Sequence, residues 1–201
     1  MKFTSLILAV LVFATATAVA QEPTTVPADR VQALIIQLKS DNLDELCKAA
    51  LALARIGPSA RAAIPALLEA CKLNAPKGLA QREAALALIT IVEEKDVPLL
   101  IKALADENES VRESAVVVLW ALGPRAKAAV PSLTKLLSTD NLLCFSNVCG
   151  ALGSIGKAAE PAIPALVAAL NDKQWRVRAM AASTLGMRRN ENRNVARRNL
   201  A

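Results

Sequence analysis

The sequence predicts an all-α protein, a right-handed α-solenoid of about five tandem antiparallel helix pairs. Its composition is 54% hydrophobic but only 2% aromatic, which suits closely packed helices of Ala, Leu, Val and Ile better than a β-sandwich. Two columns of residues repeat every 33 positions, and a fixed period of this length is the signature of a repeat architecture. The columns are Pro65, Pro98, Pro131 and Pro164, and Leu53, Leu86, Leu119, Leu152 and Leu185.

Residues 1–20 are set apart from the fold because they resemble a signal peptide. Lys2 precedes an apolar segment, and Ala18-Val19-Ala20 resembles a cleavage site. A retained membrane anchor is the alternative, since residues 3–20 approach the length of a spanning helix. The segment carries four Thr and Ser residues and becomes less apolar towards the cleavage site, which favours removal after Ala20. We therefore expect a secreted or periplasmic protein with no transmembrane segment after signal removal, and a solenoid domain over residues 21–187.

The first helix of each period is expected to begin at the repeating proline, because proline fits the first turn of a helix. In the first period, Gln32-Ala33-Leu34 fills this position without a proline. Each first helix should end at a polar turn whose residues can cap the next helix. These turns are Ser40-Asp41-Asn42, Asp106-Glu107-Asn108, Ser138-Thr139-Asp140-Asn141 and Asn171-Asp172-Lys173.

The second helix of each period should carry the stripe that builds the core. In the third period this stripe is Val111, Ala115, Leu119 and Leu122, which share one helical face. The leucine column and the column of Ile56, Ile89, Leu122 and Ile155 continue it through the other periods. The second helices should end at Gly57, Gly123 and Gly156, because glycine terminates helices readily.

Two segments allow the repeat to be compared with known families. Asp106-x4-Val111-Arg112-x2-Ala115-x3-Leu119 and its counterpart from Asp172 to Leu185 resemble HEAT repeats of the short bacterial lyase type. The resemblance covers residues from about 28 to 188. Ankyrin repeats share the period, but the chain has no histidine for their T-P-L-H signature, and tetratricopeptide repeats need aromatic positions that this chain lacks.

The resemblance implies that Arg112 and Arg178 bond the turn aspartates across neighbouring copies, which is a structural role. Trp120 stands in a column of small residues, so we expect its ring to fill the space between copies, over Gly153. Trp175 falls in a turn column and is the better candidate for a binding contact.

The cysteines number four, which in an exported chain raises the question of disulfides. Antiparallel stacking would place Cys47 and Cys71 on the same side of the solenoid, so a Cys47–Cys71 disulfide is kept as a hypothesis. Cys144 is expected to be a buried apolar residue. Without histidine or a C-x2-C spacing, neither a metal site nor any cofactor is indicated. Histidine is the commonest general base and the usual activator of a Ser or Cys nucleophile, and the chain has none, so we expect no enzymatic activity.

The net charge of +6 is concentrated at the C-terminus. Residues 188–201 contain five arginines and one glutamate, which leaves the solenoid close to neutral. This segment is expected to be a polar cap or tail. The alternative is that its arginines bind an anionic surface. A nucleic-acid partner is not expected for an exported chain, and no small-molecule ligand is indicated.

The predicted function is that of a non-enzymatic scaffold that binds a protein or peptide on the concave face formed by the second helices. The alternative is an accessory subunit for an enzyme or for chromophore or cofactor attachment, which would depend on a cysteine. The residues expected to line the concave face are Lys48, Arg55, Gln81, Leu88, Ser114, Val118, Asn147 and Met180.

Overall fold

The computed structural model describes the backbone of residues 27–73, 78–138 and 142–198, and the side chains of residues 27–73, 78–137 and 144–186. The predicted signal peptide and its cleavage after Ala20 lie outside the described residues. The arginine side chains of the predicted tail lie outside them as well.

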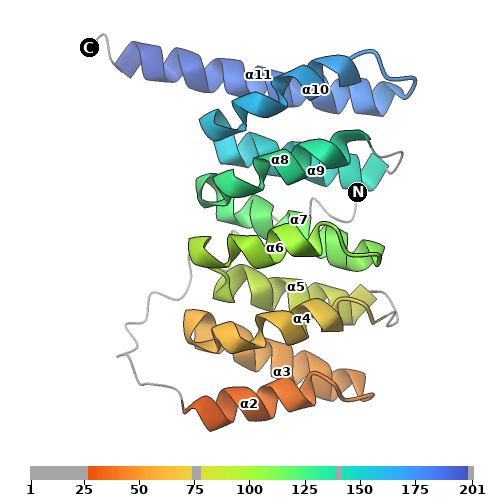
Figure 1. The fold of residues 1–201 in the computed structure, drawn as a ribbon, viewed down its shortest axis with the longest axis vertical. Helices are drawn as coiled ribbons and strands as arrows, with labels where there is room; N and C mark the ends of the chain where they lie inside the picture. The colour runs from red at the N-terminus through yellow and green to blue at the C-terminus, as the bar shows by residue number, and fades with distance from the viewer. Residues whose placement is uncertain (1–26, 74–77, 139–141, 199–201) are drawn as a thin grey trace.

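Five antiparallel helix pairs follow one another in the described part of the chain, which contains no strand (Figure 1). The solenoid predicted from the 33-residue period is therefore confirmed. The pairs are α2 (Ala28–Gln37) with α3 (Leu43–Ile56), α4 (Ile64–Ala70) with α5 (Leu79–Ile91), α6 (Val97–Ala103) with α7 (Glu109–Leu122), α8 (Val130–Lys135) with α9 (Leu142–Ile155), and α10 (Ile163–Ala169) with α11 (Trp175–Arg198). The helix α11 continues across the predicted boundary between residues 187 and 188.

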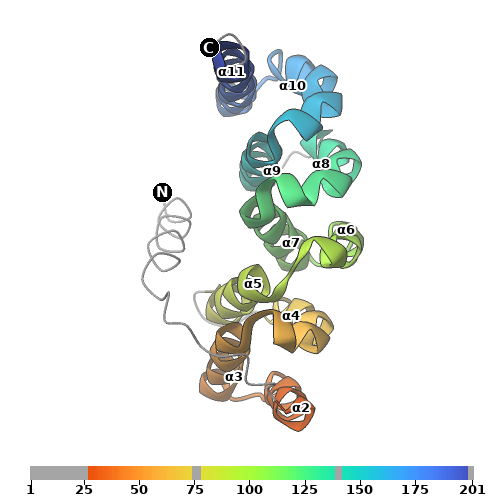
Figure 2. The ribbon, with the colours of Figure 1, turned by 90° about the vertical axis from the view of Figure 1, so that its left-hand side faces the viewer.

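The pairs stack into a curved array. Figure 2 shows the first helices of the pairs on the outer side of the curve and the second helices on the inner side. Each second helix packs against the second helix of the next pair, from α3 through α5, α7 and α9 to α11. The side of the solenoid expected to be concave is thus the side that the second helices form.

The predicted start and stop residues act as expected. A proline occupies the first turn of α4, α6, α8 and α10. Asn108 caps α7, because its side chain accepts a hydrogen bond from the backbone N–H of Ser110 at 2.9 Å. The helices α3 and α7 end at glycines with positive φ, 67° at Gly57 and 56° at Gly123, a conformation that side chains with a Cβ rarely adopt. Gly156 follows α9 in the same conformation.

The second pair departs from the 33-residue register. Leu88 and Ile91 of α5 are fully buried, whereas Leu86 and Ile89, which the repeating columns place in the core, are half-buried. Thr90 stands where the first, third and fourth pairs have a terminating glycine, so α5 continues to Ile91. Only the five residues 92–96 then connect α5 to α6, against the seven residues Gly57–Ala63 between α3 and α4. The core stripe of α5 is therefore displaced by about half a helical turn.

Asp96 links this shortened connection to the preceding connection, Gly57–Ala63, which joins the first and second pairs. Its side chain is buried and forms an ion pair with Nε of Arg61. The other carboxylate oxygen accepts a hydrogen bond from the backbone N–H of Glu93 at 3.1 Å. The position one period away is alanine, Ala63 or Ala129, so this carboxylate is specific to the second pair.

Two stretches, Leu43–Ala70 and Glu109–Lys135, are long and apolar enough to cross a membrane by length and composition alone. Each stretch is a pair of helices joined by a 3-10 turn rather than one continuous helix. The longer helix in each has 14 residues, about 21 Å, against roughly 30 Å of bilayer hydrocarbon. Their apolar character is explained by the core of the solenoid.

Candidate functional site

Half of the eight residues expected on the concave face are buried inside the solenoid instead. Leu88, Ser114, Val118 and Asn147 are buried, with exposed fractions of 5% or less. For Leu88 the cause is the register displacement of α5. Val118 lies seven residues after Val111, about 20° away around the helix, and so belongs to the core stripe. Ser114 and Asn147, one period apart, lie to one side of that stripe and are buried as well. The expected face was therefore wrong at these four positions.

A hydrogen-bond network shows which way Ser114 faces. Its hydroxyl donates to the carbonyl of Ser110 at 2.7 Å, and Nε2 of Gln81, in the preceding pair, donates to the same carbonyl at 3.2 Å. In the next junction, Ser154 of α9 donates to the carbonyl of Trp120 in α7 at 2.9 Å. These side chains join adjacent second helices.

The remaining predicted residues are solvent-accessible. Lys48 and Arg55 are exposed on α3. This helix is the first of the second helices in the described part of the chain, so no earlier second helix covers that side of it. Gln81 and Met180 are half-buried. Lys48 and Arg55 therefore mark the first end of the stack rather than the concave strip.

The true inner strip lies opposite the core stripe of each second helix. At 100° per residue, the positions opposite Val111 and Leu119 in α7 include Trp120. Allowing for the displacement of α5, the same strip contains Leu51 of α3 and Leu86 and Ile89 of α5. We call Leu51, Leu86, Ile89 and Trp120 the inner row. Leu51 is 48% exposed and the other three are half-buried.

A helical wheel centred on the Val111 stripe places Trp120 on the opposite side of α7, so the sequence alone could have identified it as an inner residue. The displacement of α5 could not be predicted in this way, because its one signal in the sequence is the absence of glycine at position 90.

Charged groups beside the inner row are few and mostly paired. Arg82 forms an ion pair with Glu83 at 3.1 Å. The pKa of Glu113 is raised, chiefly by burial and then by the neighbouring Glu109, while a hydrogen bond from Gln81 and the charge of Arg112 oppose the rise. The inner row is thus an apolar strip with a weakly charged border.

The sequence suggested that Trp120 lies over Gly153, but its ring lies over Gly150 instead. A Cβ added to Gly150 would lie 2.8 Å from Cη2 and Cζ2 of the Trp120 ring. The ring therefore rests directly on the backbone of α9, and a glycine at this position is what permits the contact. The interpretation that Trp120 fills the space between copies is confirmed, while the residue as a whole stays half-buried.

Trp175, at the start of α11, is 65% exposed. The guanidinium of Arg176 lies 5.6 Å from the centre of its ring, within the range of a cation–π interaction. The expected exposure of Trp175 is therefore observed, at the turn edge of the last pair and away from the inner row.

The repeated Asp and Arg residues close the turns of their own copies. Nη1 of Arg112 donates to the backbone carbonyls of Asp106 at 2.8 Å and Glu107 at 2.7 Å, and Arg178 makes the corresponding bonds in the last pair. These contacts are structural, but they do not cross between copies. An ion pair that Asp106 does make between copies joins its Oδ2 to Nζ of Lys72 at 3.6 Å.

The four cysteines are free thiols, so the hypothesis of a Cys47–Cys71 disulfide is not supported. The thiol of Cys71 is hydrogen-bonded with Ser114 in α7, whereas Cys47 lies near Glu83 and Arg82 of α5. The two thiols thus face different helices.

Burial raises the pKa of Cys71 to about 11, against a smaller opposing effect of its hydrogen bond with Ser114. Burial likewise raises the pKa of Cys149 to about 11, opposed by a hydrogen bond with Thr184. The pKa values of Cys47 and Cys144 are also raised, mainly by burial and then by nearby carboxylates. The nucleophilic thiolate form is therefore disfavoured at all four positions. Among the described residues, no group of three or more potential metal ligands comes together.

Comparison with known proteins supports the repeat assignment. The sequence model for HEAT repeats matches residues 31–120 and again residues 97–186. Comparison with curated protein sequences finds no match.

Several solved structures are similar. One is a complex of CpcE and CpcF of phycocyanin lyase from Nostoc sp. PCC7120, with 28% identity, a TM-score of 0.54, and coverage of 86% of this chain and 67% of that chain. A chain from a study of microtubule plus-end tracking by XMAP215, CLIP-170 and EB1 has 19% identity and a TM-score of 0.57, with coverage of 92% and 83%. A designed armadillo repeat protein in complex with the peptide (KR)4 has 19% identity and a TM-score of 0.51, with coverage of 78% and 81%. The last two similarities concern the fold.

Proposed function

Because the chain belongs to the HEAT-repeat family, we propose that it is a non-enzymatic scaffold that binds a peptide or a helix of another protein on its concave face. The observation that carries this proposal is the inner row. Four large apolar side chains, Leu51, Leu86, Ile89 and Trp120, keep accessible surface on the inner side of the curve, where a monomer gains nothing from exposing them.

The inner row suits an apolar segment that lies across several helix pairs. Its residues come from α3, α5 and α7, so a partner would contact consecutive second helices. Full burial of a leucine or isoleucine side chain stabilises a complex by about 1.5–3 kcal/mol relative to leaving it in water. Trp120 adds a flat surface whose position is fixed by Gly150, so little side-chain entropy is lost when a partner binds.

Site-specific photocrosslinking tests this proposal. Leu86 would be replaced by p-benzoylphenylalanine in the producing cells, and the adducts formed on irradiation would be identified by mass spectrometry. Leu99, on the outer helix α6 and 40% exposed, gives the matched control. We expect one dominant adduct from position 86 that is absent from position 99. The same adducts at both positions, or none at position 86, would rule out the concave face as the binding site.

We further propose that the protein acts outside the cytoplasm, after removal of residues 1–20. The support is the pattern of Lys2, an apolar segment and Ala18-Val19-Ala20. Mass spectrometry of the protein recovered from the envelope and the medium should show Gln21 as the first residue. Recovery of a protein that begins at Met1, from the cytoplasm alone, would contradict export.

An accessory role in an enzyme or cofactor-attachment reaction is the second candidate, favoured by the similarity to the CpcE–CpcF complex. The raised pKa values of the cysteines oppose any version of this role that needs a reactive thiol. The two candidates differ in the partner: the photocrosslinking experiment would yield an enzyme subunit or a chromophore-bearing protein if the accessory role is correct.

A further inference from the structure

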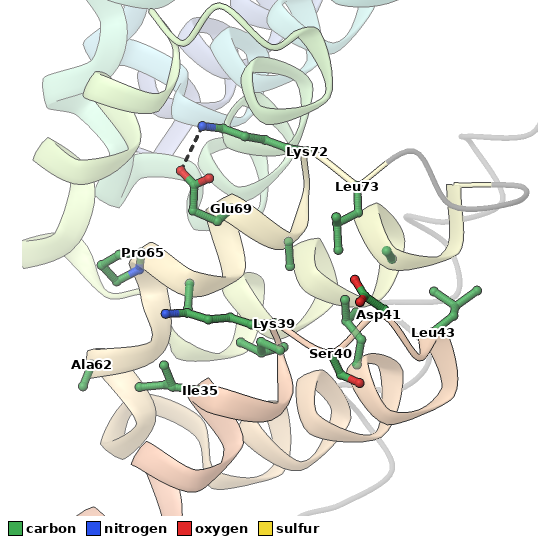
Figure 3. A pocket seen from close by; sticks show the side chains of 15 residues that line it. Ile35, Lys39, Ser40, Asp41, Leu43, Ala62, Pro65, Glu69, Lys72 and Leu73 are labelled. Atoms are coloured by element: carbon green, nitrogen blue, oxygen red, sulfur yellow. Dashed lines mark hydrogen bonds and ion pairs between the residues drawn. The ribbon is translucent and has the colours of Figure 1, made fainter.

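A groove of about 760 Å³ opens between α2 and α4, on a different part of the molecule from the inner row. Its apolar lining includes Leu38, Leu46 and Ala70, which are almost fully buried. Ile35 and Leu73 lie at its edge, and Leu73 is 46% exposed (Figure 3). The volume falls in the range of roughly 300–1,000 Å³ typical of ligand sites.

The repeat itself shows what this groove lacks. Lys39 in the first pair and Lys72 in the second stand one period apart, as do Leu73 and Asp106. Between the second and third pairs, Lys72 forms an ion pair with Asp106 across the junction, at 3.6 Å. Between the first and second pairs, the repeat position of that carboxylate is occupied by Leu73, so the chain supplies no equivalent partner for Lys39.

Within the described part of the chain, Lys39 therefore presents an ammonium group without an ion-pair partner, in a groove whose lining is mostly apolar. The other polar residues of that lining are Ser40, Asp41, Glu69 and Lys72. Among the described residues, no carboxylate oxygen lies within ion-pair distance of its Nζ atom, whereas Lys72 also contacts Glu69 at 2.9 Å. Figure 3 shows Lys39 extending towards Pro65 and Ile35, while Asp41 lies at the opposite end of the groove. The positive charge and the negative charge of Asp41 are thus separated along the groove.

We propose that this groove binds an aliphatic segment of a partner protein that carries one carboxylate side chain. The carboxylate pairs with Lys39, as the carboxylate of Asp106 pairs with Lys72, and aliphatic side chains occupy the space between α2 and α4. Asp41 repels a second acidic group at the other end, so the segment is apolar there. The site is independent of the inner row and can be occupied at the same time.

Selection from a phage-displayed library of random dodecapeptides on the purified full chain tests this proposal. Selected peptides would then be measured against Leu73→Asp, which should supply the missing carboxylate within the chain and close the site. Because Leu73 is at the edge of the groove and partly exposed, the substitution should leave the fold intact. Lys39→Gln removes the positive charge, and Lys48→Gln removes an exposed lysine outside the groove as the matched control.

We expect the selected peptides to share an Asp or Glu next to Leu, Ile or Val, and to lose saturable binding to Leu73→Asp. Lys39→Gln should weaken binding about threefold to fivefold, the size of one partly exposed ion pair, and Lys48→Gln should leave it unchanged. Peptides without an acidic residue, binding that persists on Leu73→Asp, equal effects of the two lysine substitutions, or failure to enrich any peptide would each overturn the proposal.

Discussion

The contact between Trp120 and Gly150 provides the sharpest test of how adjacent copies pack. Replacing Gly150 with alanine would place a Cβ atom 2.8 Å from two carbons of the indole ring, closer than carbon atoms approach in a folded protein. Alanine gains about 1 kcal/mol over glycine from helix propensity, whereas overpacking costs about 1–3 kcal/mol. With a mid-range overpacking cost, we expect Gly150→Ala to lower the free energy of unfolding by about 1 kcal/mol.

Gly186 provides the matched control, since a Cβ added there has no atom within 4 Å. Gly186→Ala should gain the helix propensity alone and stabilise the protein by about 0.5–1 kcal/mol. Both variants would be compared by urea denaturation followed by circular dichroism. In a Trp175→Phe background, the fluorescence of Trp120 reports separately on movement of its ring, which we expect only for Gly150→Ala.

The Trp120→Ala background completes the test as a double-mutant cycle. Without the indole ring, Gly150→Ala should become stabilising, with a coupling energy of about 2 kcal/mol between the two positions. Equal stabilisation by Gly150→Ala and Gly186→Ala in the wild-type background, with unchanged Trp120 fluorescence, would show that the ring does not rest on Gly150.

Three other predictions follow from the packing. Leu88→Ala should cost about 2–5 kcal/mol because Leu88 is fully buried, whereas Leu86→Ala should cost about 1 kcal/mol; urea denaturation giving the reverse order would refute the displaced register of α5. Arg61→Ala should cost about 1–2 kcal/mol, since it leaves the buried carboxylate of Asp96 without its cation, and no measurable change would show that the pair is unimportant. Because burial raises the pKa of Cys71 from 9.0 to about 11, the stability due to its protonated thiol is complete below pH 9 and is lost as the pH rises to 11. Denaturation at pH 8 and pH 11 should therefore show a larger loss for the wild type than for Cys71→Ala, and equal losses would contradict the shift.

Much of the architecture is readable from local patterns. Proline at the first turn and glycine with positive φ act within a few residues, so the boundaries at Pro65, Gly57 and Gly123 could be predicted from the chain alone. The core stripe of α7 is equally local, because helical geometry places Val111 and Leu119 on one face. The side of the curve that the second helices form also follows from the repeat.

Which residues form the proposed binding surface, by contrast, does not depend on neighbouring residues alone. A second helix inside the solenoid contacts its own first helix and the second helices of both neighbouring pairs. Helical periodicity identifies the first contact, but the other two bury further faces, which is why Ser114 and Asn147 are buried although they lie to one side of the core stripe. Only a narrow strip stays accessible, and the sequence pattern assigned that strip to the wrong side of the helix.

The sequence by itself therefore determined the repeat, the helix pairs and their caps, because each depends on the chemistry of neighbouring residues. The tertiary structure decided which apolar residues are accessible. It displaced α5 so that Leu88 enters the core and Leu86 reaches the inner row, set Trp120 on Gly150, and placed Lys39 at the groove between α2 and α4. These features depend on the length of a connection and on contacts between copies, and such contacts exist only once the chain has stacked.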